Sequence, residues 1–309
     1  MHPAYSVILF TTASGAGYGL LALLGLAAAR HGQASSLAFG LTAMVVALGL
    51  ITVGLLSSTF HLGRPERAWR AFSQWRSSWL SREGVAAVLT FLPALAFGAV
   101  WSGLYEAPQW IAPLGIITAV MCAITVYCTA QIYASLKTIR AWHQSLTAPV
   151  YLALGLATGA AVLTALAAVF GRFQPFQVWL AVAALGVAAL LKALYWRAID
   201  AAPRKHTIEA ATGLGRIGQV SQWEVPRTAI NFVQKEMGYA VARKHGAGLR
   251  FMAIALLIAA ILLLLLSLKA PLVSLAAAAV ALAATMVERW LFFAEAQHVS
   301  TLYYGAKAA

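Results

Sequence analysis

Eight long uncharged stretches constrain this chain more than any other feature of its sequence. Each has at least 18 consecutive residues without Asp, Glu, Lys, Arg or His, about the length that a helix needs to cross a hydrocarbon core of about 30 Å. They are Pro3–Ala29, Gly32–Phe60, Gly84–Tyr105, Ala107–Leu136, Gln144–Gly171, Phe173–Leu191, Phe251–Leu268 and Ala270–Val287. We therefore predict an all-α fold, a polytopic bundle of eight transmembrane helices that forms a single integral membrane anchor domain over residues 1–309.

The composition supports a lipid environment. Only 10% of the 309 residues are charged and 61% are hydrophobic, and a water-soluble domain with these proportions would expose large apolar patches. The first stretch has no basic residue before its apolar run and is longer than the core of a signal peptide, so we interpret it as a helix. Within it, the spacing of Gly15 and Gly19 predicts close packing against a neighbouring helix.

The 22 Lys and Arg residues predict the orientation of the chain. With eight spans, both termini and the loops after the second, fourth and sixth helices share one side, which holds 19 of them, whereas the other side holds Arg30, Arg172 and Lys269. If only the short loops are counted, the first side has seven basic residues and the other side has three. The positive-inside rule then predicts a bacterial inner-membrane protein whose N- and C-termini are cytoplasmic. Because no basic tract is interleaved with aromatic residues in a soluble module, the net charge of +13 does not indicate a nucleic-acid partner.

One segment is long enough for sizeable structure outside the membrane. Residues 196–249, between the sixth and seventh helices, have mixed charges, several glycines and two prolines, Pro203 and Pro226. This pattern predicts a long cytoplasmic loop with short helices. We interpret the loop as a docking surface.

The positions of the histidines and cysteines indicate whether the chain can bind haem or a metal ion. All seven histidines lie outside the predicted hydrocarbon centre, whereas a membrane cytochrome b usually needs histidines that face one another across helices. We therefore expect no haem, although a haem near the surface on His61 and His143 stays open. Cys122 and Cys128 form no metal-binding pattern, so no metal site is predicted. The third to sixth spans contain few polar groups, which argues against a chain of buried ionisable residues of the kind that an ion pump uses.

Residues 61–83, which join the second and third helices, carry the most informative chemistry. His61 ends one helix and Glu83 begins the next, so we expect the two side chains to be neighbours on one side of the membrane. A quinone site needs an apolar slot open to lipid together with polar groups that contact the carbonyls and exchange protons. His titrates near neutral pH, and a partly desolvated Glu can titrate in the same range.

A structural interpretation of the same segment is also compatible with the spacing. His61 would cap one helix, Glu83 would lie in the first turn of the next helix where its charge suits the dipole, and the loop arginines would only set topology. The tryptophans of the loop, Trp69, Trp75 and Trp79, would lie at headgroup depth in either case. Spacing alone leaves both interpretations open.

Motifs over essentially the whole chain resemble the anchor subunit family of dimethyl sulfoxide reductase. They are the opening Met1–Thr12, Ser14–Gly19, His61–Pro65, Ser78–Glu83, Tyr133–Arg140 and Glu288–Glu295. The resemblance implies an eight-helix, haem-free subunit that binds an iron–sulfur electron-transfer subunit, which in turn contacts a molybdopterin catalytic subunit. Iron–sulfur clusters and molybdopterin would then belong to these partner subunits.

The resemblance also implies site residues. The quinol-site histidine of the family falls on His61 and its acidic partner on Glu83, so we predict these two as catalytic residues. For binding of quinone, either ubiquinone or menaquinone, we predict His61, Arg64, Trp79 and Glu83.

Orientation narrows the resemblance within the family. In its type member the N-terminus and the quinone site are periplasmic, whereas the charges of this chain place the corresponding loop in the cytoplasm. The chain is therefore most similar to the membrane subunit of cytoplasmic sulfite:quinone oxidoreductase (sulfite dehydrogenase), which passes electrons from sulfite to quinone. The alternatives are a quinol-oxidising anchor of a dimethyl sulfoxide reductase-type terminal reductase and a membrane tether without a redox role.

Overall fold

The computed structural model describes residues 3–203, 206–224 and 241–308, and for residues 61 and 241–244 it describes the backbone alone. Eight helices in this part of the chain are long and apolar enough to cross a membrane, and the same residues form no strand. The all-α prediction and the eight spans are therefore confirmed. The helices are α1 (Tyr5–His31), α2 (Leu37–Ser57), α3 (Trp79–Ser102), α4 (Ile111–Ala134), α5 (Thr147–Val169), α6 (Pro175–Ala201), α9 (Val241–Ser267) and α10 (Val273–Ala294).

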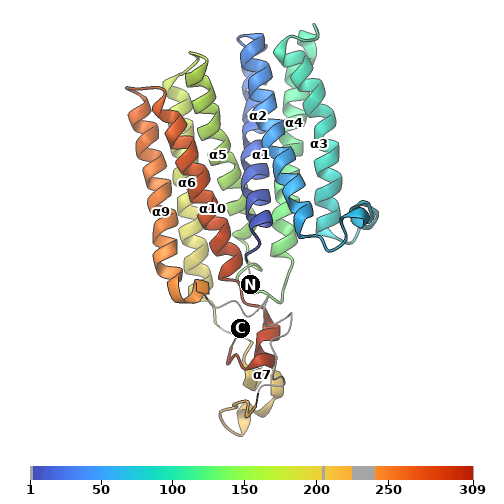
Figure 1. The fold of residues 1–309 in the computed structure, drawn as a ribbon, viewed down its shortest axis with the longest axis vertical. Coiled ribbons are helices and arrows are strands. Elements are labelled where there is room, and N and C mark those ends of the chain that lie inside the picture. Colours follow the sequence, from blue (N-terminus) through green and yellow to red (C-terminus); the bar gives the residue numbers. More distant parts are fainter. Residues whose placement is uncertain (1–2, 204–205, 225–240, 309) are drawn as a thin grey trace.

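The spans form two groups of four that meet along α1 and α5 (Figure 1). In the first group α1 packs on α2 and α4, and α3 packs on α2 and α4; in the second, α5, α6, α9 and α10 pack in a closed ring. Contacts of α1 with α5 and α10, and of α4 with α5, join the groups. The central position of α1 agrees with its burial. Of the apolar span in α1, 78% is buried inside the protein, whereas in α9 this share is 22%.

Glycines allow the central helices to approach closely. A Cβ atom added to Gly19 of α1 would overlap the carbonyl group of Gly155 in α5, and one added to Gly159 would overlap the backbone of Gly19. Gly25 and Gly115 make the same kind of contact between α1 and α4. The predicted packing role of the α1 glycines is confirmed, because only a residue without a side chain fits where two backbones touch.

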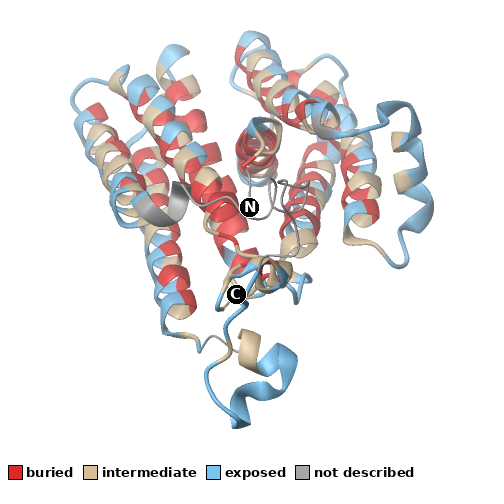
Figure 2. Ribbon diagram, turned by 60° about the horizontal axis from the view of Figure 1, so that its bottom comes forward, coloured by how far each residue is buried: buried red, intermediate tan, exposed pale blue. Residues whose placement is uncertain are grey.

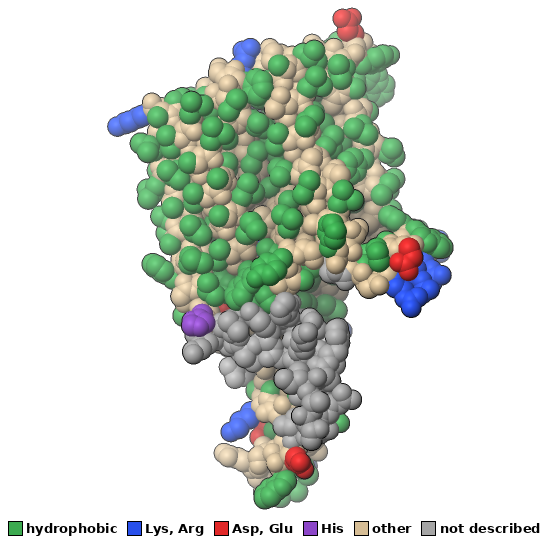
Figure 3. All heavy atoms as spheres, in the orientation of Figure 1, with side chains coloured by type: hydrophobic (Ala, Val, Ile, Leu, Met, Phe, Trp, Pro, Cys, Tyr) green, Lys and Arg blue, Asp and Glu red, His purple; other side chains and the backbone are tan. Residues whose placement is uncertain are grey.

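On the face that Figure 3 shows, the lateral surface of the bundle is apolar and the exposed charged side chains lie at its ends. Large hydrophobic residues such as Val45, Leu92 and Leu190 point outward and are more than half exposed. Lipid tails solvate such a surface, whereas water would not. The two chain termini lie at the same end of the bundle (Figure 1), as an even number of spans requires.

Among the described residues, short helices extend or connect the long ones. They are η1 (Ser58–His61), η2 (Pro65–Gln74), η3 (Pro108–Trp110), α7 (Ile208–Thr212), η4 (Leu214–Arg216) and η5 (Val299–Tyr304). Of these, η1 and η3 overlap the ends of two spans. The predicted loop 196–249 is shorter than expected, because α6 continues to Ala201 and α9 begins at Val241. Residues 204–205 and 225–240 of that loop lie outside the described part of the chain. The backbone N–H of Ile208 donates to the carbonyl of Lys307, at 3.2 Å, and so connects the loop to the C-terminal segment.

Helix α3 begins earlier than the uncharged stretch Gly84–Tyr105 indicates. The Ser78 hydroxyl accepts a hydrogen bond from the backbone N–H of Ser81, and helical structure starts at Trp79. This N-cap satisfies one of the free donors of the first turn. Glu83 therefore lies inside the helix and not at its first residue.

Candidate functional site

The carboxyl group of Glu83 lies between α3 and α4 at the end of the bundle that holds the chain termini. Only 5% of the residue is exposed, although the sequence placed it near water at a helix end. The Thr129 hydroxyl of α4 donates to Glu83 Oε1 at 2.5 Å. Because a buried carboxyl group without a donor is costly, this hydrogen bond helps to hold Glu83 in its buried position.

A row of threonine hydroxyls continues from Glu83 into the bundle. The Thr129 hydroxyl is also within hydrogen-bond distance of the Thr125 carbonyl oxygen, at 3.1 Å, so its single proton can serve either acceptor. The hydroxyl oxygens of Thr125 and Thr90 are 3.0 Å apart. All three threonines are buried. Since Thr90 lies seven residues beyond Glu83 in α3, the row extends about two helical turns, or about 10 Å, along the interface.

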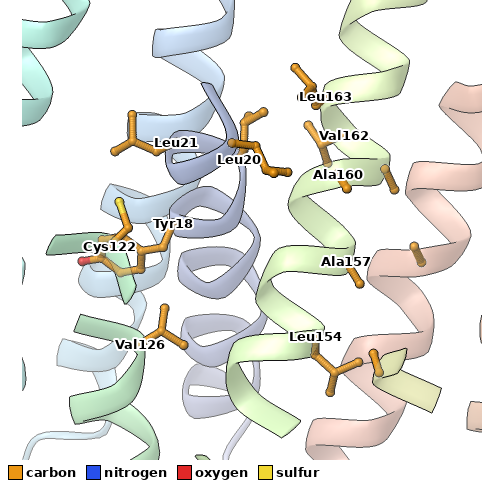
Figure 4. Packing of buried hydrophobic residues seen from close by; sticks show 14 of the residues in the cluster. Tyr18, Leu20, Leu21, Cys122, Val126, Leu154, Ala157, Ala160, Val162 and Leu163 are labelled. Carbon is orange, nitrogen blue, oxygen red and sulfur yellow. The ribbon is translucent and has the colours of Figure 1, made fainter. Parts of the chain in front are cut away.

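Tyr18 brings a phenol from α1 to the same interface. Its ring lies beside Cys122 of α4 (Figure 4), and its buried hydroxyl has no hydrogen-bond partner among the described atoms. The phenol is within electrostatic range of Glu83. An unpaired buried donor is uncommon and indicates either strain or a missing acceptor.

Trp79 shares the α4-facing side of α3 with Glu83, because the two are four residues apart on one helix. Its ring packs edge-on against Tyr127 of α4 with centroids 6.0 Å apart, and the Arg82 guanidinium carbon lies 4.3 Å from its ring centroid. Two of the predicted site residues, Trp79 and Glu83, therefore lie on one face of α3.

The other two predicted residues are not joined to Glu83 by any described contact. Arg64 is exposed at the N-cap of η2, and it forms no ion pair among the described side chains. The backbone of His61 ends η1, but its side chain lies outside the described part of the structure. The predicted contact between His61 and Glu83 thus stays a prediction.

His143, the second histidine of the open haem alternative, lies in the connection between α4 and α5. Its Nδ1 is 2.6 Å from the Ala134 carbonyl oxygen, so that ring nitrogen is engaged. The residue lines a cavity of about 270 Å³ together with Gln131 and Gln144. No group of three or more His, Cys, Asp or Glu residues that could hold a metal ion occurs among the described residues.

The prediction of few polar groups in the third to sixth spans missed Lys192 of α6, which lies in a buried ionic cluster with two residues of α10. Lys192 of α6 forms an ion pair with Glu288 of α10, at 2.5 Å between Nζ and Oε1. Arg289 Nη1 lies 3.3 Å from Glu288 Oε2, and its guanidinium lies 3.5 Å from the ring centroid of Tyr151. All three charged side chains are almost completely buried. The sequence criterion missed these residues because an uncharged stretch ends at its first charged residue. Helices α6 and α10 continue past Lys192 and Glu288, since paired charges are tolerated inside a bundle.

A second ionic cluster lies closer to the aqueous end of the same group of helices. Arg250 of α9 donates to Asp200 Oδ2 at 2.6 Å and to Glu295 Oε1 at 2.8 Å. Burial raises the pKa of Glu295 above its ordinary value, although the hydrogen bond from Arg250 lowers it in part. The cluster fastens the ends of α6, α9 and α10 together.

The threonines and the phenol of the interface were absent from the sequence prediction. Thr125 and Thr129 are four residues apart on an apolar helix, which places both on one face, and this spacing was the available signal. The sequence did not show that the facing helix would place Glu83 against them. Helix pairing decides that, and pairing depends on contacts between distant segments.

The fold and the site define the class of the protein. It is an integral membrane protein of eight spans whose described extramembrane segments are short, and it has a buried carboxyl group near one membrane surface. Such a chain is suited to the role of a membrane subunit that works with partners.

Comparison with known proteins gives the family. The chain belongs to the DMSO reductase anchor subunit (DmsC) family, whose model matches residues 1–305. It is 34% identical to a sulfite dehydrogenase subunit from Allochromatium vinosum in an alignment over 333 positions that covers 100% of both chains. The resemblance on which the sequence prediction rested is therefore confirmed, and the chain is an anchor subunit of a multi-subunit complex.

Proposed function

We propose that this chain takes electrons from a bound iron–sulfur subunit and reduces quinone near Glu83, while a molybdopterin subunit of the same complex oxidises sulfite. The observation that carries the proposal is the buried carboxyl group of Glu83, held by Thr129 at the membrane surface. A buried ionisable group in a membrane bundle is costly and is a functional candidate for that reason. The name of the relative in Allochromatium vinosum supports sulfite as the electron source.

The residues around Glu83 have the chemistry that a quinone headgroup requires. A quinone takes up two electrons and two protons when it is reduced, so its site needs groups that exchange protons beside an apolar surface. The Glu83 carboxyl and Thr129 hydroxyl are the polar groups, and the rings of Trp79 and Tyr127 provide flat apolar surface beside them. Leu80, half exposed on the same turn of α3, faces outward and would leave the surface open to lipid.

Each side chain has a distinct task in this proposal. Glu83 holds a proton on its carboxyl group and releases it to a quinone oxygen, while the Thr129 hydroxyl fixes the orientation of that carboxyl. His61 takes the second proton from water and releases it to the other quinone oxygen. Trp79 positions the ring of the quinone, and the positive charge of Arg64 favours a partly anionic oxygen nearby.

The experiment uses the purified complex and compares two activities, sulfite oxidation with a water-soluble dye and sulfite oxidation with quinone. We expect Glu83→Gln and His61→Ala to abolish quinone-linked turnover and to leave dye-linked turnover intact, because only the first requires protons at the quinone. Matched controls are Glu66→Gln, an exposed carboxylate in the same loop, and His31→Ala at the opposite end of the bundle. Normal quinone turnover in a Glu83→Gln, His61→Ala double variant would contradict the proposal.

Quinol oxidation coupled to reduction of dimethyl sulfoxide or a similar acceptor is the second candidate, and the family match favours it. The two candidates differ in the location of the catalytic subunit. A twin-arginine export signal on that subunit would favour the reductase, and a catalytic subunit retained in the cytoplasm with sulfite-dependent quinone reduction would favour the first candidate.

A further inference from the structure

We propose that η2 is an interfacial helix that binds the headgroups of anionic phospholipids. The segment connects the spans that end at Phe60 and begin at Trp79, so it lies at the boundary of the membrane. It projects sideways from the bundle beside α3 (Figure 1), and almost all of its residues are exposed (Figure 2). The proposal is independent of the quinone chemistry.

The helix type sorts the side chains of η2 into stripes. A 3₁₀-helix has three residues per turn, so residues i and i+3 lie one above the other. Trp69, Phe72 and Trp75 form an aromatic stripe, and Trp75 continues it because the C-cap keeps helical dihedral angles. The next stripe has Arg67, whose Nε lies 3.9 Å from Glu66 Oε1, and then Arg70, Ser73 and Arg76 in the same register.

The third stripe turns toward the protein. It has Ala68 and Ala71, the two residues of η2 that are partly buried. In the aromatic stripe, Phe72 packs the edge of its ring over Gly84 of α3. Apart from that contact, the aromatic and basic stripes lie on the sides of η2 that face away from the bundle.

Arg82 fixes the orientation of η2 relative to α3. Its Nε donates to the Trp75 carbonyl oxygen at 3.0 Å, and its Nη2 donates to the Arg76 carbonyl oxygen at 2.7 Å. Since Arg82 lies within the first turns of α3, these bonds hold the C-terminal end of η2 at the level where α3 begins. The stripes are thus presented at a defined depth.

Both stripes have the chemistry of a membrane surface. Trp69 and Trp75 are 66% and 50% exposed, and such rings are favoured at the level of the headgroups. Arg70 and Arg76 lie over the rings of Trp69 and Trp75, with 5.7 and 5.4 Å between the guanidinium carbon and the ring centroid. An amphipathic helix with aromatic residues on one face and arginines on the next binds in the plane of a bilayer, more strongly when the lipids are anionic. The basic side chains of this projecting segment, all of them arginines, gather next to hydrophobic and acidic ones (Figure 3).

The assay places a fluorescent label on η2 in the assembled complex. Ser73→Cys provides an exposed attachment point in η2, whereas the native Cys122 and Cys128 are buried. The complex is reconstituted in nanodiscs of phosphatidylcholine that contain a minor fraction of quencher-labelled phosphatidylglycerol or quencher-labelled phosphatidylcholine. We expect stronger quenching by phosphatidylglycerol at equal mole fraction.

A charge variant identifies the cause of the preference. The triple variant Arg67→Gln, Arg70→Gln and Arg76→Gln should lower the preference for phosphatidylglycerol over phosphatidylcholine by up to about 100-fold. Each arginine near an anionic surface contributes about fivefold to that preference. The matched control removes the same charge at the other end of the bundle, with Arg30→Gln, Arg172→Gln and Lys269→Gln, and should retain the preference. Equal quenching by the two lipids would overturn the proposal. Quenching that occurs in the isolated chain and disappears in the complex would also overturn it, because a partner protein would then cover η2.

Discussion

At the scale of single residues, the orientation of the Glu83 carboxyl depends on one hydroxyl from another helix. Thr129→Val keeps the shape of the side chain but removes the donor to Oε1. An unsatisfied buried carboxyl costs about 1–3 kcal/mol, so we expect lower thermal stability and lower quinone-linked turnover, with unchanged dye-linked turnover.

Thr118 of the same helix provides the control for this variant. Its buried hydroxyl has no hydrogen-bond partner among the described atoms, so Thr118→Val should be neutral or slightly stabilising. Thermal unfolding of the detergent-solubilised chain measures both variants. Equal losses of stability in Thr118→Val and Thr129→Val would show that the hydrogen bond to Glu83 contributes nothing.

The buried ionic cluster of the second group gives an asymmetric prediction. Lys192 and Arg289 share one carboxylate, Glu288. Glu288→Gln would leave two buried cations without an anion, which costs about 3–5 kcal/mol, whereas Lys192→Met leaves the pair of Glu288 and Arg289. We expect little folded protein for Glu288→Gln and near-normal amounts for Lys192→Met, measured as the monodisperse fraction after purification. The reverse order would show that Lys192 is the group that the fold requires.

At the scale of elements, the contact of α1 with α5 depends on the absence of side chains. Gly19→Ala places a methyl group against the Gly155 carbonyl, whereas Gly49→Ala of α2 meets no atom within 4 Å. Ala stabilises a helix by about 1 kcal/mol relative to Gly. We therefore expect opposite signs, a lower melting temperature for Gly19→Ala and an unchanged or higher one for Gly49→Ala. A decrease of the same size in both variants would contradict the close approach of the two helices.

The elements also show where prediction from sequence succeeds and where it stops. The uncharged stretches give all eight spans, because a bilayer demands apolar length whatever the neighbours are. The stretches misplace helix ends, as at Trp79, because the absence of charge takes no account of an N-cap residue or of a charged residue that is buried inside a helix. Glu83 was predicted from its motif, but its burial against Thr129 depends on the pairing of α3 with α4. The side chain of His61 stays outside what the structure describes.

At the scale of the whole molecule, both termini and the segment from η1 to α3 lie at one end of the bundle (Figure 1), as predicted. Which side of the membrane that end faces is a separate question. Lys192 and Arg289, counted with the basic side in the sequence, lie inside the spans. They do not change the balance of the short loops, seven basic residues against three, because neither residue belongs to those loops.

We therefore predict that the C-terminus faces the cytoplasm. In bacterial cells, a green fluorescent protein fused to Ala309 should fluoresce, and an alkaline phosphatase fused there should be inactive, since each reporter is active on one side only. Fusions in the loop after α1, near Gly32, should give the opposite result and serve as the control. With the termini in the cytoplasm, protons for quinone at Glu83 would come from the side that also holds the partner subunits, so turnover would not move charge across the membrane. Active phosphatase at Ala309 would show that the C-terminus is periplasmic. This orientation would favour quinol oxidation for a periplasmic reductase over sulfite oxidation in the cytoplasm.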